Sequence, residues 1–224
     1  MLPSGAGRFR EMDVYGEGDL TVMRFGPLGS FANNAYIIAD ESSGEALVVD
    51  MPSGSEEVVA AAKDFDVKGI VLTHTHHDHW VDYDLVKGAL GAPVFCHPAE
   101  QILPAEQIDE PLSDGGELAA GSLRVRALHT PGHTPGSTCL LVGKFLFSGD
   151  TLFPGGPGRT NTPANLQQSI QSITSVLFAL PDETEVLPGH GNGTTIGEAK
   201  KEYAAFAARE HPADLCGDVA WADS

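Results

Sequence analysis

Basic residues are scarce in this chain of 224 residues, which has 13 Lys and Arg against 31 Asp and Glu and a net charge of -18. Nucleic acids and anionic membranes are bound through clustered positive charge, because their phosphate groups must be neutralised. We therefore expect no nucleic-acid partner and no membrane partner, and a small molecule as the substrate. The composition leaves the oligomeric state open, a homodimer included.

Cysteine and long apolar runs are also scarce. Cys96, Cys139 and Cys216 are widely spaced and form no CxxC pair, which favours reduced, buried thiols in a cytoplasmic protein. No apolar run approaches the roughly 18 residues of a membrane-spanning helix, and residues 1–13 contain no apolar signal core. We expect a soluble protein of the cytoplasm.

Short apolar runs alternate with helical patterns along the chain. Strands are expected at 20–26, 35–39, 46–50, 70–73, 93–97, 122–128, 137–143, 145–149 and 184–190. Helices are expected at 53–65, 80–90, 163–180 and 197–210, and residues 98–116 form a loop with one helical turn. The pattern predicts one α/β domain over residues 1–224, with its core at about 20–198 and a C-terminal helix and tail at 199–224.

Local signals support several of these boundaries. Ser53 and Glu56 have the spacing of a capping box at the start of the first helix. Gly91 fits just past the end of the second helix, and Thr162 before a proline is typical of a helix start. Gly143 and Lys144 fit a two-residue hairpin turn.

Four of the nine histidines lie in one short stretch, "IVLTHTHHDHW" at residues 70–80. After a strand, His74 and His76 point to the same side as i and i+2 residues, and Asp78 and His79 can turn in from the next helix. Imidazole and carboxylate groups suit zinc or non-haem iron. Histidines that are merely hydrogen-bonded in a core, or solvated, are the competing interpretation.

Three later residues strengthen the metal interpretation. His133 lies in "HTPGHTPG", Asp150 in "LFSGDTLF" and His190 in "LPGHG", each shortly after an expected strand. Loops at the carboxyl ends of strands in an α/β sheet commonly form the ligand site. We therefore expect all these side chains to meet at one edge.

These motifs carry a family resemblance. T-H-x-H-x-D-H at 73–79, Gly132-His133, Gly149-Asp150 and Gly189-His190 resemble the motifs of the metallo-β-lactamase superfamily. The longer pieces "HTPGHTPGS", "FSGDTLFPGGPGRT" and "VLPGHG" look like its glyoxalase II branch, the hydroxyacylglutathione hydrolases, and the single-domain relatives of that branch. The resemblance implies a four-layer αββα sandwich of two mixed β-sheets flanked by helices.

The resemblance also implies the metal ligands and the cofactors, which are two zinc ions per chain, with iron or a mixed Fe/Zn pair as alternatives. It assigns one metal to His74, His76 and His133, the other to Asp78, His79 and His190, and a bridging role to Asp150. A hydroxide held between the metals would attack the carbonyl of a thioester or related ester. Asp78 would be the catalytic residue that orients or shuttles protons.

Three further residues lie near the expected ligands in the sequence motifs. Arg159, at the end of "GGPGRT", resembles the basic residue that holds a substrate carboxylate in relatives, and a loop-stabilising salt bridge is the alternative. His129 is expected to orient a ligand from behind it, with a purely structural role as the alternative. His77 fills a variable position of the motif and is expected to bind neither metal.

The sequence departs from the glutathione-specific enzymes beyond the ligands. Gly156-Pro157-Gly158 replaces the Gly-Cys-Gly of the family, "GHGNGTT" replaces Gly-His-Glu-Tyr-Thr, and only a short segment follows His190 where those enzymes have a helical domain with basic residues. Three hypotheses stay open: a binuclear thioester or ester hydrolase, a mononuclear iron dioxygenase of the persulfide type, and a non-catalytic metal-binding module. Lactonase, phosphodiesterase and β-lactamase activities are compatible with the first.

Overall fold

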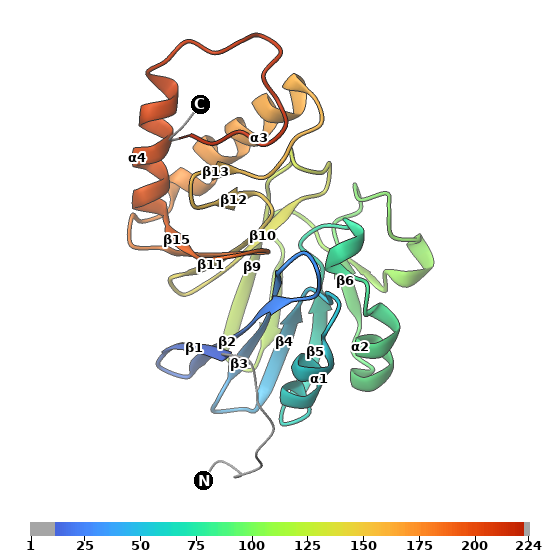
Figure 1. Cartoon of the computed structure of the whole chain (residues 1–224). Helices are drawn as coiled ribbons and strands as arrows, with labels where there is room; N and C mark the ends of the chain where they lie inside the picture. The colour runs from blue at the N-terminus through green and yellow to red at the C-terminus, as the bar shows by residue number, and fades with distance from the viewer. Residues whose placement is uncertain (1–11, 222–224) are drawn as a thin grey trace.

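The computed structural model describes residues 12–221, whose strands form two large β-sheets packed face to face (Figure 1). The first sheet contains, in spatial order, β1 (Met12–Glu17), β2 (Leu20–Leu28), β3 (Asn33–Asp40), β4 (Glu45–Val49), β5 (Asp66–Val71), β6 (Val94–Cys96) and β7 (Glu110–Pro111). The second contains β15 (Thr194–Thr195), β14 (Glu185–Pro188), β11 (Phe145–Gly149), β10 (Thr138–Val142), β9 (Leu123–His129) and β8 (Glu117–Ala120). A small ribbon pairs β12 (Leu152–Phe153) with β13 (Gly156–Pro157).

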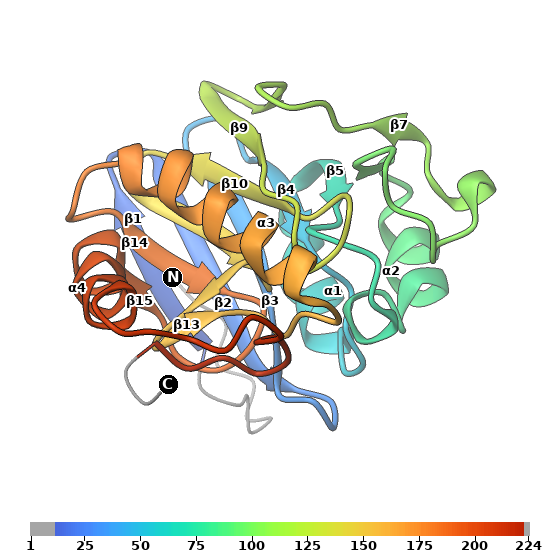
Figure 2. The ribbon, with the colours of Figure 1, turned by 90° about the horizontal axis from the view of Figure 1, so that it is seen from above.

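Both large sheets are mixed, and helices cover their outer faces. β4 to β7 run parallel in the first sheet and β11 pairs in parallel with β14 in the second, while the other pairs are antiparallel. The first sheet is covered by α1 (Glu56–Ala62) and α2 (Tyr83–Leu90), and the second by α3 (Pro163–Ser175) and α4 (Ile196–Ala207), as Figure 2 shows from above. Residues 12–221 also contain three short 3-10 turns: η1 (His77–His79), η2 (Ala105–Gln107) and η3 (Leu177–Ala179). The predicted αββα sandwich is confirmed.

Strand β3 shows how the sequence builds these layers. Its side chains alternate between two faces, and all of them are buried. Ala35, Ile37 and Ala39 pack in the core under α1 and α2, whereas Tyr36 and Ile38 pack in the core between the sheets. A strand covered on both faces is therefore apolar without interruption, which is why "AYIIA" lacks the polar alternation of a half-buried strand.

The second sheet is built in the same way. Phe145 and Phe147 of β11 face the first sheet, while Leu146 between them joins a third core with α3 and α4. Within residues 12–221 no helix is long and apolar enough to cross a membrane. Residues 1–11, which make up most of the segment without an apolar signal core, lie outside the described residues.

Several local predictions are confirmed. The Thr162 hydroxyl accepts a hydrogen bond from the Asn165 backbone N–H at 3.1 Å, which caps α3. Gly91 ends α2 with a left-handed φ of 66°, as a C-terminal glycine does. Val142 pairs with Phe145 across the expected two-residue turn.

Two helix starts were predicted wrongly. Helix α1 begins at Glu56 after Ser55, so Ser53 and Glu56 do not form a capping box. Helix α2 begins at Tyr83 and not at Trp80, because η1 occupies the preceding turn. The Asp82 carboxylate accepts the backbone N–H groups of Gly54 at 2.8 Å and Ser55 at 2.9 Å, directly before α1. It thereby holds the turn that leads into α1 from a distant part of the chain.

Six short or peripheral strands were not predicted, namely β1, β7, β8, β12, β13 and β15, and β5 begins at Asp66, earlier than the expected start at Ile70. Cys96 and Cys139 are buried as expected, but Cys216 is only partly buried, and all three thiols are free.

The C-terminal tail is packed as far as the structure describes it. Trp221 is completely buried in the core with α3 and α4, and its backbone N–H donates to the Gly155 carbonyl at 2.7 Å. The tail also forms a β-bridge between Thr160 and Gly217. It therefore holds the loop that follows β12.

Replacing Trp221 with Ala is expected to destabilise the protein by about 3–5 kcal/mol, because it empties a core position. Urea denaturation followed by circular dichroism measures the change. Ile102→Ala is the control, since Ile102 is 53% exposed and its replacement should cost less than about 0.5 kcal/mol. Equal stability of the two variants would show that the tail does not contribute to folding.

Candidate metal centre

The seven predicted metal ligands come from loops that follow four strands, and the structure brings all seven together. His74, His76, Asp78 and His79 follow β5, the last two within η1, while His133 lies between β9 and β10. Asp150 directly follows β11, and His190 follows β14. Their donor atoms form three groups: His74 with His76 and His133, Asp78 with His79 and His190, and His74 with His79 and Asp150.

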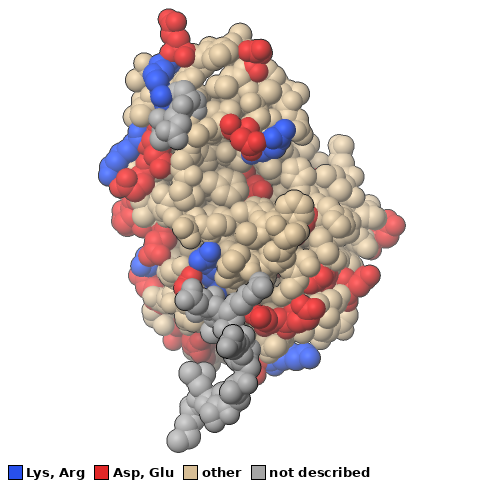
Figure 3. Space-filling model, in the orientation of Figure 1, with Lys and Arg blue, Asp and Glu red and all other residues tan. Residues whose placement is uncertain are grey.

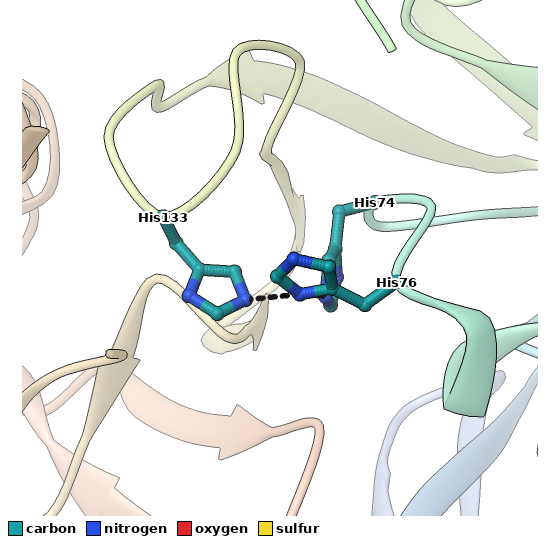
Figure 4. A group of neighbouring side chains, drawn as sticks. All are labelled: His74, His76 and His133. Atoms are coloured by element: carbon teal, nitrogen blue, oxygen red, sulfur yellow. Dashed lines mark hydrogen bonds between the residues drawn. The ribbon is translucent and has the colours of Figure 1, made fainter. Parts of the chain in front are cut away.

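In the first group, three ring nitrogens face one another (Figure 4). Nδ1 of His76 lies 3.1 Å from Nε2 of His74 and 2.8 Å from Nε2 of His133. Two nitrogen ligands of a tetrahedral zinc ion lie roughly 3.3 Å apart, given zinc–nitrogen bonds of about 2.0–2.1 Å. The separations are therefore close to those of ligands that share one ion.

The second group has the same spacing. Nε2 of His190 lies 3.2 Å from Nε2 of His79 and 3.3 Å from Oδ2 of Asp78. Asp150 lies between the groups, with Oδ2 at 3.6 Å from Nε2 of His133 and at 3.4 Å from Nε2 of His190. This position suits a carboxylate shared by two ions.

Hydrogen bonds on the far side of the rings aim these nitrogens at the centre. Nδ1 of His133 lies 2.7 Å from the Arg159 carbonyl, and Nδ1 of His190 lies 2.9 Å from the Phe31 carbonyl. A carbonyl can only accept, so both Nδ1 atoms carry a proton, which leaves Nε2 as the atom of each ring that can bind a metal.

Asp50, which the sequence analysis did not identify, connects the two groups. Its Oδ2 accepts from Nδ1 of His79 at 2.9 Å and from the Thr73 hydroxyl at 2.9 Å, and that hydroxyl lies 3.2 Å from Nδ1 of His74. One carboxylate thus orients a ligand of each group. Asp50 is 2% exposed and has a φ of 61°, a strained conformation for a residue with a side chain.

Three polar residues of β3, Asn33, Asn34 and Tyr36, also reach the site. Tyr36 and Asn34 hold the end of β14, because both donate to the Pro188 carbonyl, at 2.6 and 2.9 Å. Asn33 does more, since its amide donates to Oδ2 of Asp78 at 2.8 Å. It therefore contacts a predicted ligand directly.

The ionisable groups of the site depend on one another. Burial alone would lower the pKa of His79, but the carboxylates of Asp150 and Asp50 hold it well above its usual value. Burial likewise opposes protonation of His190, whereas hydrogen bonds to Asp150 and Asp78 raise its pKa to about 10. By contrast, burial holds the pKa of His74 well below its usual value. Without a metal, the positive charges of protonated His79 and His190 balance the negative charges of Asp78 and Asp150 at neutral pH.

The donor set fits a divalent transition metal. Oδ1 of Asp150 is buried and lacks a hydrogen-bond partner within residues 12–221, its neighbour being Nε2 of His79 at 3.4 Å. An unpaired buried carboxylate oxygen is costly, and a cation would satisfy it. Imidazole nitrogens and carboxylate oxygens suit zinc and iron alike.

A cavity of about 340 Å³ opens beside the donors, with His133, Asp150 and His190 in its wall. The rest of the wall includes Phe153, Arg159 and Asp218. Arg159 therefore lies where a substrate contact was predicted, but its Nη1 also forms an ion pair with Oδ2 of Asp218 at 2.7 Å.

Two other histidines lie away from the donor groups. The His129 ring stacks on His97 at 3.8 Å, and its Nε2 donates to the Pro135 carbonyl at 2.9 Å. Any orienting role of His129 therefore acts through the loop that carries His133. His77 is exposed and its ring lies against Trp80, 4.9 Å between centroids.

Comparison with known proteins identifies the family. The model of the metallo-beta-lactamase superfamily matches residues 28–190. The chain belongs to this superfamily. An uncharacterised protein of Aquifex aeolicus is 36% identical over 200 residues, covering 81% of this chain and 94% of the relative.

Some relatives carry functional names. A probable polyketide biosynthesis zinc-dependent hydrolase, BaeB of Bacillus velezensis, is 33% identical over 178 residues, covering 75% of this chain and 77% of BaeB. A hydroxyacylglutathione hydrolase of Polaromonas is 34% identical over 167 residues, covering 72% of this chain but only 63% of that enzyme. The hydroxyacylglutathione hydrolase is therefore longer than this chain, and the match covers less than two thirds of it.

Solved structures agree with the superfamily fold. The B3 metallo-beta-lactamase BLEG-1 has a TM-score of 0.71 and 30% identity, covering 80% of this chain and 96% of its own. ETHE1 from Myxococcus xanthus has a TM-score of 0.69 and 27% identity over 90% and 86% of the two chains. TTHA1623, crystallised in a di-iron-bound form, has a TM-score of 0.67 and 30% identity over 78% and 95%.

Gly189→Ala is expected to disrupt the centre, because a Cβ there would lie 2.5 Å from Oδ1 of Asp150 and 2.7 Å from Cε1 of His79. Metal content of the purified variant, measured by mass spectrometry, should fall well below that of the wild type. Gly88→Ala in α2 is the matched control, since its Cβ would meet nothing within 4 Å. Full metal content in Gly189→Ala would contradict the described geometry.

Zinc binding should release protons, because the raised pKa values of His79 and His190 keep these rings protonated in the metal-free protein. Apparent affinity is expected to rise between about pH 6 and about pH 8, by about tenfold per pH unit for each proton released. Calorimetric titrations in buffers of different ionisation enthalpy measure the proton count. An affinity independent of pH would show that these histidines are neutral before binding.

Proposed function

We propose that this protein is a metal-dependent hydrolase that binds two zinc ions and cleaves a thioester or a related ester. The observation that carries the proposal is the meeting of two complete ligand groups, His74 with His76 and His133 and Asp78 with His79 and His190, on either side of Asp150. The names of BaeB and of the Polaromonas hydroxyacylglutathione hydrolase support it.

The bound metal ions and Asp78 would have different roles in this reaction. When bound, paired divalent cations supply Lewis acidity and lower the pKa of water to near neutrality, so no serine or cysteine nucleophile is needed. Hydrogen bonds from Asn33 and His190 fix the carboxylate of Asp78. Burial acts to raise the pKa of Asp78, but His190, His79 and Asn33 hold it well below its usual value. A carboxylate with so low a pKa is a weak base, which favours orienting a water over shuttling its proton.

The cavity favours a small substrate. Its volume is about 340 Å³, and the segment 218–220 forms part of its wall. Arg159 offers a guanidinium to a carboxylate, yet Asp218 already balances that charge. Glutathione binding by the basic residues of an additional helical domain, as expected in the glutathione-specific enzymes, is therefore not part of the proposal.

The iron dioxygenase remains the second candidate, favoured by the structural similarity to ETHE1 over 90% of this chain. In this second candidate, a single iron ion would need only His74, His133 and Asp150 or a similar set as ligands. Asp78, His79 and His190 would then converge without a role. A non-catalytic metal-binding module would leave the open cavity beside the donors unexplained.

The proposed cellular location and partners rest on the net charge and on the three widely spaced cysteines. We place the protein in the cytoplasm, with a small-molecule substrate and with neither nucleic acid nor membrane as partner. The net charge of -18 supports this, and basic side chains do not gather into a patch on the face in Figure 3.

The deciding experiment combines metal analysis with a substrate panel. The purified protein should contain two zinc ions per chain and hydrolyse thioesters, and it should consume no oxygen with glutathione persulfide. One iron per chain together with oxygen consumption would overturn the proposal in favour of the dioxygenase.

A pair of histidine variants tests the second ligand group. His79→Ala should lose one metal and lower kcat/KM by on the order of 100-fold or more, because it removes electrostatic stabilisation at the reaction centre. His77→Ala, two residues away in the same turn and exposed, should retain both metals and the activity. Equal activity of the two variants would exclude a catalytic second site.

Asp218→Asn should change substrate preference by freeing the charge of Arg159. The pair is mostly exposed, and such pairs contribute about 0.2–1 kcal/mol, so KM for anionic thioesters should fall by at most about fivefold. KM for a neutral thioester should change little. Glu198→Gln, which breaks the surface pair with Lys201, is the control, and an identical response of both variants would show that Asp218 does not act on substrate.

A further inference from the structure

Glu100 is a buried acidic residue without an assigned role. It follows β6 in the segment 98–116, which the sequence analysis leaves as a loop, and is 8% exposed. Within residues 12–221 its carboxylate forms no ion pair with Lys or Arg. Burying a carboxylate without a counter-charge is costly unless hydrogen bonds replace its water.

Four hydrogen bonds replace that water, and they come from two different loops. Oε2 accepts from the Thr75 backbone N–H at 2.9 Å and from the Thr75 hydroxyl. Oε1 accepts from the Gly136 backbone N–H at 2.8 Å and from the Thr134 hydroxyl at 2.5 Å. Each carboxylate oxygen of Glu100 therefore accepts hydrogen bonds from one of the two loops.

These two loops carry the first ligand group. Thr75 lies between His74 and His76, and Thr134 directly follows His133. Apart from Glu100, the loops are tied by a backbone hydrogen bond from Thr138 to Thr73 at 2.9 Å, at their bases. Glu100 joins them next to the ligands themselves.

The position of the Glu100 side chain depends on the absence of a side chain at Gly136. A Cβ at Gly136 would lie 2.7 Å from Cγ of Glu100 and 2.8 Å from its Oε1. Only a glycine at 136 lets the carboxylate reach both loops. The second glycine of "HTPGHTPG" thus has a physical reason that involves neither a turn nor a metal ligand.

We propose that Glu100 is a positioning residue that holds the His74–His76 loop and the His133 loop at the separation that metal binding requires. Among the described residues it forms no hydrogen bond with a predicted ligand side chain, and it acts through the backbone and hydroxyl groups beside the ligands. The inference rests on the metal-binding role proposed above and is independent of which reaction the protein catalyses.

Glutamine is the informative replacement. It preserves the size of the side chain, but its amide has one oxygen acceptor and one NH2 donor. The NH2 group would face a backbone N–H, of Thr75 or of Gly136, so one loop must be released. Residues behind metal ligands typically contribute 10- to 100-fold to metal affinity, and we expect Glu100→Gln to weaken at least one metal-binding step by about that factor.

The test titrates the metal-free full-length protein with Zn²⁺ against a chromophoric chelator, and with Co²⁺ while visible absorption reports coordination geometry. Glu106→Gln is the matched control, because Glu106 is exposed in the same segment. The expected result is weaker Zn²⁺ binding and an altered Co²⁺ spectrum for Glu100→Gln alone. Thermal denaturation of the metal-free variants separates this effect from a merely structural one, which would lower stability without changing the affinity of the folded protein.

Thr134→Ala provides a second variant that removes only one of the four hydrogen bonds, should Glu100→Gln not fold. Its Zn²⁺ affinity should lie between those of Glu106→Gln and Glu100→Gln. Affinities and Co²⁺ spectra of Thr134→Ala and Glu100→Gln equal to those of Glu106→Gln would overturn the inference while leaving the proposed function intact. A wild-type protein that binds neither ion would overturn both.

Discussion

Mutual repulsion among the donor atoms is the constraint on which the rest of the structure depends. Two carboxylates and five imidazoles direct their metal-binding atoms into adjoining groups, with separations such as 2.8 Å between Nδ1 of His76 and Nε2 of His133 and 3.4 Å between Oδ2 of Asp150 and Nε2 of His190. Such an arrangement needs positive charge, from protons or from metal ions. The fold must therefore hold these groups against their own electrostatics.

The sandwich meets this demand by anchoring each donor near the end of a buried strand and tying it from behind. Asp50 orients His79 directly and His74 through Thr73, while backbone carbonyls orient His133 and His190. Glycine at 189 leaves the space in which Asp150 and His79 meet. The tail, anchored by Trp221, then closes one side of the cavity next to the donors.

How much of this the sequence predicts depends on whether a signal is local. The convergence of the seven side chains was predictable because His74 to His79 form a dense motif and because His133, Asp150 and His190 each follow a strand beside a glycine. The cap of α3 and the hairpin at Gly143 were predictable because each depends on neighbouring residues.

Features that depend on distant contacts were missed. Asp82 holds the turn before α1 through a hydrogen bond that spans 27 residues, and no local pattern reveals it. Glu100 looks like any other acidic residue among 31, and the roles of Asp50 and Glu100 follow from the loops that the fold brings to them. An aspartate that ends an apolar strand, as in "ALVVD", was the one signal that pointed to Asp50.

The central claim is that the seven donors hold two metal ions in two neighbouring sites. Anomalous X-ray diffraction at the zinc absorption edge, from crystals of the protein grown with zinc, tests it most directly. The account predicts two anomalous peaks, one among His74, His76 and His133 and one among Asp78, His79 and His190, with Asp150 between them. A single peak at full zinc occupancy, or peaks outside these groups, would contradict it.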